Sequence, residues 1–263
     1  MEYDLKVLNL GAGVDSSAML LASEFGLWGV PKVDFAVYLD TGADPHWVKE
    51  QIEKLKGICK TPIHIVKGPR PLREVVLDPE SVVAIPCYTE PRGMGGRQCT
   101  ELTKLRRIKK HIREECGVQF RQRMRKKVVS FVGIDADEKR RAKNRSEGVW
   151  TVDYPLVTAG KGRQDCRNLI RRFGLGIFHR SSCIFCPLHK KKTWCSIAMN
   201  ATKEEFEEVK KVDRGIRNQY LEQKGVKQYL HYRRDAIEEI DWKKEYETLE
   251  DSEKRGFEEE WGA

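Results

Sequence analysis

Three cysteines have the type and spacing of ligands for one metal centre. Cys183 and Cys186 form a C-x-x-C pair, and Cys99 lies in the segment RQCT at the start of a basic helix. A zinc ion or an iron–sulfur cluster needs three or four soft ligands that converge from separate segments. The sequence therefore predicts a metal site, although a redox pair would also explain one C-x-x-C. The candidates for a fourth ligand are Cys87, Cys195, His189 or no protein group.

A second candidate site is a glycine-containing turn in the segment LNLGAGVDSSAML, between an apolar strand and a helix. Gly11 and Gly13 allow a ligand to approach the backbone closely. Asp15, Ser16 and Ser17 fall at the helix start, where free N–H groups and hydroxyls bind anions. The segment has no Walker lysine, and Ser16 replaces the third glycine of a dinucleotide fingerprint. It predicts a phosphate site of another kind, while an ordinary capped turn would also fit.

Two further polar turns follow predicted strands. Asp40-Thr41-Gly42 ends the strand over Val33–Gly42, which places Asp40 and Thr41 beside the first turn in a parallel sheet. The segment GIDADEKRRAK begins at Gly133 and puts several carboxylates and Arg141 after another strand. A cap or a charged loop would explain either turn alone. Polar turns at adjacent strand ends favour a shared site, with Gly133 and Arg141 in contact with a nucleotide or Mg²⁺.

The elements that must position these turns alternate between strands and helices. Strands are predicted over residues 5–10, 33–42 and 62–68, with helices over 15–25 and 44–59 between them. This alternation implies a parallel sheet with ligands at the carboxyl ends of its strands. The later segments predict strands over 126–134 and 149–157, a mobile loop over 79–98, and helices over 100–117, 163–174 and 202–223.

We therefore predict an α/β fold with a doubly wound, mostly parallel five-stranded sheet, a cysteine-rich segment and a helical C-terminal tail. Residues 1–200 would form the α/β domain with the metal-binding cysteines, and residues 201–263 an acidic helical extension. The chain has no apolar run close to the ~20 residues of a membrane span and no signal-peptide pattern at its N-terminus. We expect a cytoplasmic protein that does not enter a membrane.

The charge of the chain is unevenly distributed. The net charge is +9, but residues 235–263 contain 12 acidic and 4 basic residues, so residues 1–234 carry +17. The densest basic block, Lys104–Lys127, has 11 Lys and Arg against Glu114 and Glu115. It fits either a solvated helix face or a footprint for the phosphate backbone of a nucleic acid. The acidic tail would be a solvated helix or a cover over the basic face.

The eight cysteines are not expected to form disulfides, since a reducing compartment argues against a disulfide framework. Clustered cysteines in such a compartment more often bind metal or take part in catalysis. Cys59, Cys116 and Cys166 fall within or at the ends of predicted helices, and we expect them to be small buried apolar groups.

Six short motifs, in chain order between Leu5 and Trp194, resemble those of the PP-loop ATP pyrophosphatase superfamily, whose fold is adenine nucleotide alpha hydrolase-like. GAGVDSS is similar to its Ser-Gly-Gly-x-Asp-Ser loop. LDTGADP, RQCTELTKLRRI, GIDADEKRR and DYPLV resemble segments of its phosphoadenosine phosphosulfate (PAPS) reductase branch, and SSCIFC matches the late C-x-x-C of the iron–sulfur members. The combination looks most like PAPS-reductase-like proteins of phages and prophages.

Three departures from that pattern bear on function. Gly11 and Ala12 replace a serine and a glycine of the loop, so phosphate contacts must come from the backbone, Ser16 and Ser17. The paired cysteines of the family are reduced to Gln98-Cys99. The sulfonucleotide reductases act through a cysteine near the C-terminus, and this chain has none after Cys195. The departures argue against a true PAPS reductase.

The resemblance then implies an ATP-dependent sulfurtransferase that acts on a nucleic acid or a nucleotide. ATP adenylates an oxygen of the substrate, pyrophosphate leaves, and sulfur displaces AMP. A 4Fe-4S cluster held by three cysteines leaves one iron open, which suits it to deliver sulfur. Mg²⁺ and donors at the helix start would stabilise the leaving pyrophosphate without a Walker lysine.

The expected site has four groups of residues. Asp15 and the three cysteines take part in catalysis. ATP contacts Gly11, Gly13, Asp15, Ser16, Ser17, Asp40, Thr41, Gly133 and Arg141. The metal ligands are Cys99, Cys183 and Cys186. The acidic substrate faces Arg97, Lys104, Arg106 and Arg107.

Two other functions remain open from the sequence. One is a PAPS-type sulfonucleotide reductase that uses an internal nucleophile such as Cys195. The other is a non-enzymatic nucleic-acid-binding protein stapled by Zn²⁺ on Cys99, Cys183, Cys186 and His189. A protein partner that supplies sulfur or electrons is compatible with either enzyme, and a homodimer is one option for the assembly.

Overall fold

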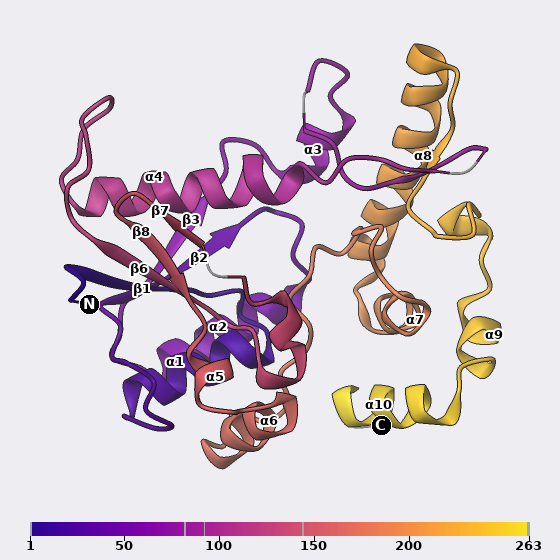
Figure 1. Cartoon of the computed structure of the whole chain (residues 1–263). Coiled ribbons are helices and arrows are strands. Elements are labelled where there is room, and N and C mark those ends of the chain that lie inside the picture. Colours follow the sequence, from indigo (N-terminus) through magenta and orange to yellow (C-terminus); the bar gives the residue numbers. More distant parts are fainter. Residues whose placement is uncertain (1, 82, 92, 144, 262–263) are drawn as a thin grey trace. The chain divides into compact units, whose positions relative to one another are not determined.

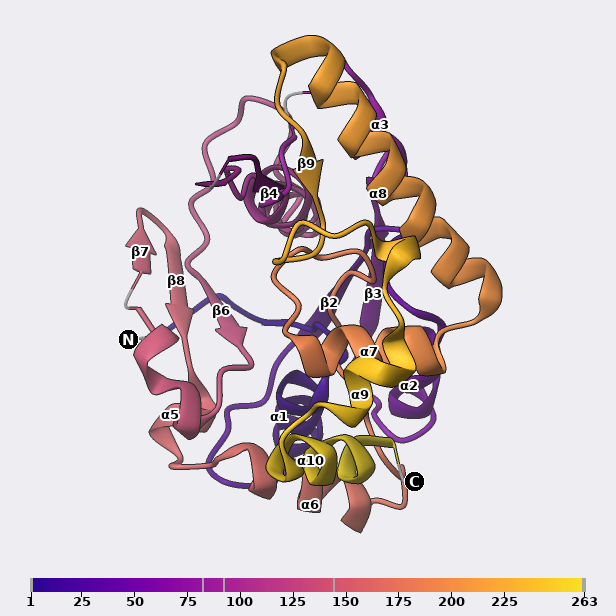
Figure 2. The same ribbon diagram turned by 90° about the vertical axis from the view of Figure 1, so that its right-hand side faces the viewer.

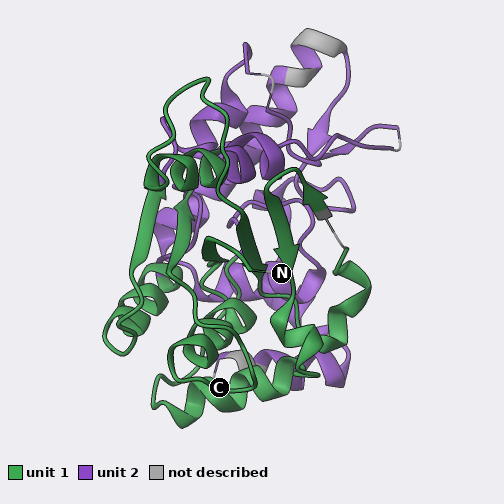
Figure 3. Ribbon diagram, turned by 60° about the vertical axis from the view of Figure 1, so that its left-hand side comes forward, with its two compact units in different colours: residues 1–40, 47–66, 107–181 green, residues 41–46, 67–106, 182–263 purple. Residues whose placement is uncertain are grey.

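The computed structural model describes residues 2–81, 83–91, 93–143 and 145–261. The chain divides into two compact units, coloured separately in Figure 3. Unit 1 comprises residues 1–40, 47–66 and 107–181. Unit 2 comprises residues 41–46, 67–106 and 182–263. Unit 2 thus takes segments from both sides of residue 200, where the sequence suggested a boundary.

Unit 1 contains a mostly parallel, six-stranded sheet with the strand order β3-β2-β1-β6-β8-β7 (Figure 1). The strands are β1 (Leu5–Asn9), β2 (Phe35–Asp40), β3 (Ile63–Lys67), β6 (Val128–Val132), β7 (Arg145–Glu147) and β8 (Trp150–Asp153). Strand β1 pairs in parallel with β2 and β6, and β6 in parallel with β8. The sequence predicted five of these strands; the sixth, β7, is a short strand antiparallel to β8.

Helices cover both faces of the sheet in unit 1 (Figure 1). They are α1 (Val14–Glu24), α2 (His46–Lys56), α4 (Arg106–Glu115), α5 (Pro155–Thr158), α6 (Arg163–Arg172) and the 3₁₀ helix η2 (Ala136–Arg141). On one face, Ile112 of α4 packs in a core with Val7 and Val37 of the sheet. Helices α1 and α6 pack against each other. Strands β2 and β6 are buried for most of their length, and β1 is buried at Val7 and Leu8, as expected for a parallel sheet covered on both faces.

Unit 2 is mainly helical and includes a small sheet of the order β5-β4-β9 (Figure 2). Its helices are α3 (Leu72–Leu77), the π-helix η1 (Thr100–Leu105), α7 (Lys191–Asn200), α8 (Lys203–Lys224), the 3₁₀ helix η3 (Ile237–Glu239), α9 (Trp242–Glu247) and α10 (Asp251–Trp261). Its strands are β4 (Tyr88–Thr89), β5 (Gly93–Met94) and β9 (Gln228–Tyr229). Trp194 and Phe185 are fully buried in its core. No helix in the described part of the chain combines the length and apolar composition needed to cross a bilayer.

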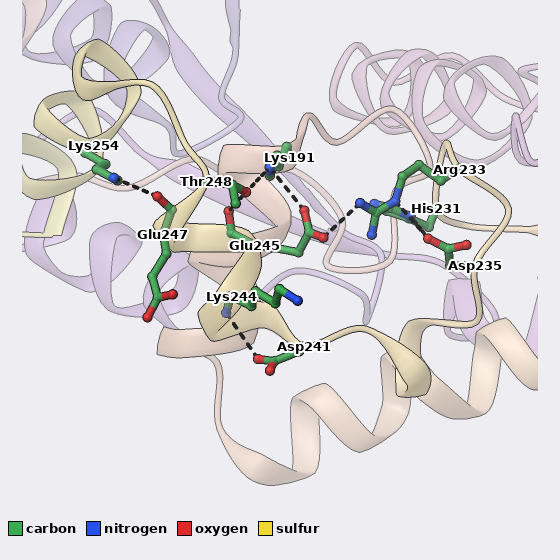
Figure 4. Close-up of polar contacts among 10 residues, drawn as sticks. All are labelled: Lys191, His231, Arg233, Asp235, Asp241, Lys244, Glu245, Glu247, Thr248 and Lys254. Atoms are coloured by element: carbon green, nitrogen blue, oxygen red, sulfur yellow. Dashed lines mark hydrogen bonds and ion pairs between the residues drawn. The ribbon is translucent and has the colours of Figure 1, made fainter.

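The acidic C-terminal tail is part of the packed structure of unit 2, because its charges are paired within that unit (Figure 4). The carboxylate of Glu245 accepts from Lys191 at 3.2 Å and from Arg233 at 2.8 Å. Asp235 binds the same guanidinium at 2.8 Å. Helices α9 and α10 also pack against α7, so this tail is more than the solvated helix that its composition allowed.

Candidate functional site

The strand order of unit 1 has a topological switch point between β1 and β6, where the direction of winding reverses. Strand β2 follows β1 on one side of it, and β6 lies on the other side. Ligands of open α/β sheets bind outside the carboxyl ends of the strands at such a point. The loops that leave β1 and β6 meet there: a Cβ on Gly133 would lie 2.7 Å from the backbone N and Cα of Ser16. The structure thus brings Gly133 against the start of α1, and only glycine fits this contact.

The turn between β1 and α1 is closed by its own groups. Ala12 has a φ of 59°, a left-handed conformation that is costly for a residue with a Cβ. The Ser16 hydroxyl accepts from the Gly11 N–H at 3.2 Å and donates to the Gly13 carbonyl at 3.4 Å. Ser16 therefore shapes the turn in addition to lying at the helix start. A strained conformation held by local bonds is common at ligand sites.

Residues 179–181 run beside this turn, and the sequence gave no signal for them. The Gln51 side-chain amide donates to the Ala12 carbonyl at 2.5 Å and accepts from the His179 N–H at 2.6 Å. Trp47 donates to the Arg180 carbonyl at 2.9 Å. The Ser181 hydroxyl would be 2.8 Å from a Cβ added to Gly13. Gly13 thus leaves room for this second serine at the turn.

Three buried polar atoms at the start of α1 and the end of β1 have no hydrogen-bond partner among the described residues. They are Asn9 Oδ1, Asp15 Oδ1 and Ser17 Oγ. Buried polar atoms in native proteins are nearly always paired, so each such atom requires an explanation. A bound water or a polar ligand at the turn would satisfy them.

The surroundings of Asp15 favour its protonated form. Burial raises its pKa to about 6, and the neighbouring Asp135 adds to the shift. Arg163, whose guanidinium contacts Asp15 Oδ2 at 2.5 Å, opposes it only in part. A divalent cation would reverse this balance, since it stabilises the ionised carboxylate. Arg163 is a second site residue that the sequence motifs did not indicate.

In the charged loop after β6, Asp135 and Asp137 bond to other parts of unit 1, whereas Arg141 lies at the surface. Asp135 is buried and caps η2 through the Glu138 N–H at 3.0 Å. Asp137 accepts from the Arg163 N–H at 2.8 Å, at the start of α6. Arg141 instead forms an ion pair with Glu138, with 66% of its side chain exposed. In the free protein Arg141 thus points to solvent, and Arg163 is the arginine that contacts Asp15.

The Asp40-Thr41-Gly42 turn spans the boundary in the chain between the two units. Asp40 is the last residue of β2 in unit 1. In unit 2, the Thr41 hydroxyl donates to Asp44 at 3.0 Å, so Thr41 also acts as a local cap. The Ile184 N–H donates to the Ala43 carbonyl at 2.8 Å. This bond places the turn beside the C-x-x-C segment within unit 2.

The three predicted metal ligands, Cys99, Cys183 and Cys186, all belong to unit 2. Cys99 and Cys183 pack against the same apolar core, which includes Phe185 and Trp194. Burial raises the pKa of the Cys186 thiol, and Cys99 raises it further, so the two thiols are close enough to interact. Burial and the charge of Cys186 likewise raise the pKa of Cys183. Cys99 and Cys183, which are 84 residues apart in the sequence, thus border the same core.

The local backbone at the C-x-x-C is that of a thiolate-binding turn. The N–H of Phe185 donates to the Cys183 sulfur, and the N–H of Leu188 donates to the Cys186 sulfur. The Cys186 N–H donates to the Cys183 carbonyl at 3.1 Å. Hydrogen bonds to sulfur favour the thiolate and tune iron–sulfur centres. Lys104 counteracts the rise in the pKa of both thiols, and Arg97 does so at Cys186.

The candidates for a fourth ligand differ in position. Burial raises the pKa of Cys87, and Cys186 and Cys99 contribute, so Cys87 lies with the other thiols. Burial raises the pKa of Cys195 to about 11, with Glu245 as the main charged contributor. His189 Nε2 lies 2.9 Å from the Cys183 carbonyl oxygen. Of the three, Cys87 is the one whose thiol interacts with those of Cys99 and Cys186.

The spacing of the thiols bears on the type of metal centre. In the described residues, His64, His111 and Glu115 form the one set of three His, Cys, Asp or Glu whose ligand atoms all lie within 4.8 Å of one another. Cys99, Cys183 and Cys186 are therefore spread more widely than this. Sulfurs on one tetrahedral zinc ion would be about 3.8 Å apart, given a Zn–S bond near 2.3 Å. All three sulfurs could therefore bind one zinc ion only after a movement of their side chains.

The basic residues predicted to face the substrate occupy both units. Arg97 donates to Thr100 at 3.2 Å, and Arg106 pairs with Glu101 at 3.7 Å, both in unit 2. The charge of Lys104 acts to lower the pKa of the Cys183 and Cys186 thiols. Arg107 begins the part of α4 that belongs to unit 1. In the loop between α4 and β6, Phe120 is 88% exposed, with the Arg121 guanidinium 5.3 Å from its ring centre.

Comparison of the chain with protein-family models and with curated proteins finds no match of either kind.

Proposed function

We propose that the protein is an ATP-dependent sulfurtransferase of the PP-loop type, which replaces an oxygen of a nucleic acid or nucleotide by sulfur. The observation that carries the proposal is that Cys99 and Cys183 border one apolar core of unit 2, while the thiol of Cys186 interacts with both. The partnerless polar atoms at the turn of unit 1 support the nucleotide half of the reaction.

The turn after β1 would hold the β- and γ-phosphates of ATP. The Ser181 hydroxyl lies beside Gly11 and Gly13 and would face the phosphates together with Ser17, whose hydroxyl has no partner among the described residues. Asp15 would bind Mg²⁺, which commonly uses one or two carboxylates together with phosphate oxygens. The substrate oxygen then attacks the α-phosphorus, and pyrophosphate leaves. Donors at the helix start stabilise the charge that develops on the leaving group.

Cys99, Cys183 and Cys186 would hold a 4Fe-4S cluster. Bound there, the cluster would supply the sulfur chemistry, and the oxygen that sulfur replaces leaves as part of AMP. The two N–H groups that donate to the sulfurs, together with Arg97 and Lys104, would offset the negative charge of the thiolates.

A nucleic acid is the substrate class that best fits the charge. Residues 1–234 carry +17, and the loop between α4 and β6 combines exposed arginines with the exposed ring of Phe120. Basic side chains neutralise phosphates, and an exposed aromatic ring can stack on an unpaired base. The exposed loop would therefore bind single-stranded segments in preference to a regular duplex.

The reaction products test the proposal. Protein purified without oxygen is incubated with ATP, Mg²⁺, sulfide and RNA or DNA, and nucleotides and modified bases are measured by mass spectrometry. We expect AMP and pyrophosphate in proportion to the sulfur incorporated. Cys186→Ser should abolish sulfur incorporation, whereas Cys116→Ser, a cysteine of unit 1, should leave it unchanged. Formation of ADP and phosphate, or thiolation that survives Cys186→Ser, would contradict the proposal.

A further inference from the structure

A histidine pair and a carboxylate form a compact cluster in unit 1, remote in sequence from the cysteines. His64 Nδ1 and His111 Nε2 are 2.8 Å apart. Glu115 Oε1 lies 3.8 Å from the first nitrogen and 3.7 Å from the second. All three ligand atoms thus face one point.

The fold fixes this arrangement from two sides. His64 lies on the edge strand β3, and His111 and Glu115 are one turn apart on α4, so they share a face of that helix. The Phe35 ring of β2 stacks on His64 with centroids 4.5 Å apart and meets the edge of His111 at 6.2 Å. Each ring therefore has little freedom to turn away from the cluster.

The separations suit a small divalent cation. Ligand atoms on tetrahedral zinc lie about 3.4 Å apart, given bond lengths near 2.0–2.1 Å. The observed values of 2.8, 3.7 and 3.8 Å fall on both sides of that distance. Small side-chain rotations would equalise them. Two imidazoles and one carboxylate also match the donor preference of Zn²⁺.

The position of Glu115 is otherwise unfavourable. It is the last residue of α4, where a negative charge opposes the helix dipole. Glu114 beside it is paired with Lys110 at 3.6 Å. Among the described residues, the ion-pair partners of Glu115 are the two imidazoles, despite the many lysines and arginines in this part of the sequence. A bound cation would account for an acidic group at this point.

We infer that His64, His111 and Glu115 bind Zn²⁺, with a fourth position open to water. The ion would fasten the C-terminal end of α4 to the edge strand β3. Between 20% and 41% of each ligand side chain is exposed, so the ion can enter and leave. This site does not depend on the proposed sulfur transfer.

Cobalt provides a probe that separates this site from the cysteines. Metal-free full-length protein is titrated with Co²⁺ and followed by visible and near-ultraviolet absorption, then with Zn²⁺ by calorimetry. Ligation by nitrogen and oxygen gives d–d bands without the intense thiolate-to-cobalt band. We expect one such ion per chain. His64→Gln and His111→Gln should each weaken its binding about 100-fold or more.

Two further variants distinguish loss of the metal site from a general loss of folding. Glu115→Ala changes a partly exposed helix end and should fold, and it too should weaken binding. His46→Gln is the matched control, because His46 forms a 2.9 Å pair with Glu205 in unit 2 but has no second histidine in that pair. Cobalt bound only with thiolate bands, or an affinity unchanged by His64→Gln and Glu115→Ala, would overturn the inference. Loss of this ion with iron retained would leave the sulfurtransferase proposal intact.

Discussion

Two partly buried carboxylates, one in each unit, have similar side-chain exposures but differ in their surroundings and partners. Asp15 in unit 1 is 12% exposed and Glu245 in unit 2 is 16% exposed. Asp15 has one oxygen on Arg163 and the other without a partner, and burial raises its pKa to about 6. Burial also acts to raise the pKa of Glu245, but its bonds from Arg233 and Lys191 outweigh burial and lower it.

The contrast separates a carboxylate that the fold pairs with cations from one that we propose to bind Mg²⁺. The chain supplies two cations to Glu245, so that carboxylate is satisfied by the fold alone (Figure 4). At Asp15 the fold leaves a polar atom unpaired beside two others, Asn9 Oδ1 and Ser17 Oγ. Such sites cost stability in the free protein and are retained where a ligand completes them.

The largest effect is expected from Asp15→Asn, which removes the proposed Mg²⁺ ligand. We expect the kcat/KM for ATP cleavage to fall at least about 100-fold, which corresponds to about 2.7 kcal/mol of transition-state stabilisation. Pyrophosphate release measures it. Asp34→Asn, at the amino end of β2, is the matched control and should keep the activity. Activity equal to that of the wild type in Asp15→Asn would contradict the proposed role of Asp15 as an Mg²⁺ ligand.

Because the pKa of Asp15 is raised in the folded protein, stability should fall as pH rises through the acidic range. Folded Asp15 binds its proton more tightly than the unfolded chain does, so the free energy of unfolding falls as pH rises from about 4 to about 6. The shift corresponds to a loss of up to about 3 kcal/mol. Urea titrations at several pH values measure it. The difference between wild type and Asp15→Asn isolates this group, and a difference independent of pH would contradict the assignment.

Glu245→Ala should act on stability alone. It leaves Lys191 and Arg233 without this partner, and we expect the free energy of unfolding to fall by about 2 kcal/mol. Glu247→Ala is the control, because the bond that Lys254 donates to Glu247 goes to its backbone carbonyl and survives the change. Chemical denaturation gives both values, and the affinity for ATP should stay the same. A weaker affinity for ATP in Glu245→Ala would show that the two carboxylates are not separated as proposed.

The smallest change is expected at Ser17. Ser17→Ala removes a buried hydroxyl that has no partner among the described residues, so the free energy of unfolding should stay the same or rise slightly. Ser23 on the same helix bonds the Pro31 carbonyl and the Val33 N–H, both at 2.9 Å, and Ser23→Ala should cost about 1–2 kcal/mol. ATP affinity should show the reverse order. Equal losses of stability in the two variants would mean that Ser17 is bonded in solution.

The strands that the sequence predicts are those with strong local signals. Strands β1, β2 and β6 are apolar runs that follow or precede glycine turns, and all of them lie in the sheet. Strand β7 was missed because Arg145–Glu147 is polar and short, and it forms only by pairing with β8. Strands β4 and β5, in the segment predicted as a mobile loop, have two residues each and depend on pairing with each other and with β9, more than 130 residues later.

The sequence indicated the candidate residues that lie in recognisable motifs. It did not indicate those that reach the turn only through tertiary contacts. The glycine turn and the three cysteines carry sequence patterns. Gln51 and Arg163 reach the turn only after α2 and α6 have packed, and no spacing in the sequence indicates that. Arg141 differs for a local reason, because it forms an ion pair with Glu138 three residues before it in the chain.

Iron and acid-labile sulfide per chain, measured with the ultraviolet–visible spectrum on protein purified without oxygen, test the central claim most directly. We predict about four irons and four sulfides in wild type and in Cys87→Ser, and their loss in Cys99→Ser, Cys183→Ser and Cys186→Ser. Colourless, iron-free wild-type protein, or iron that survives the loss of Cys99, would contradict it.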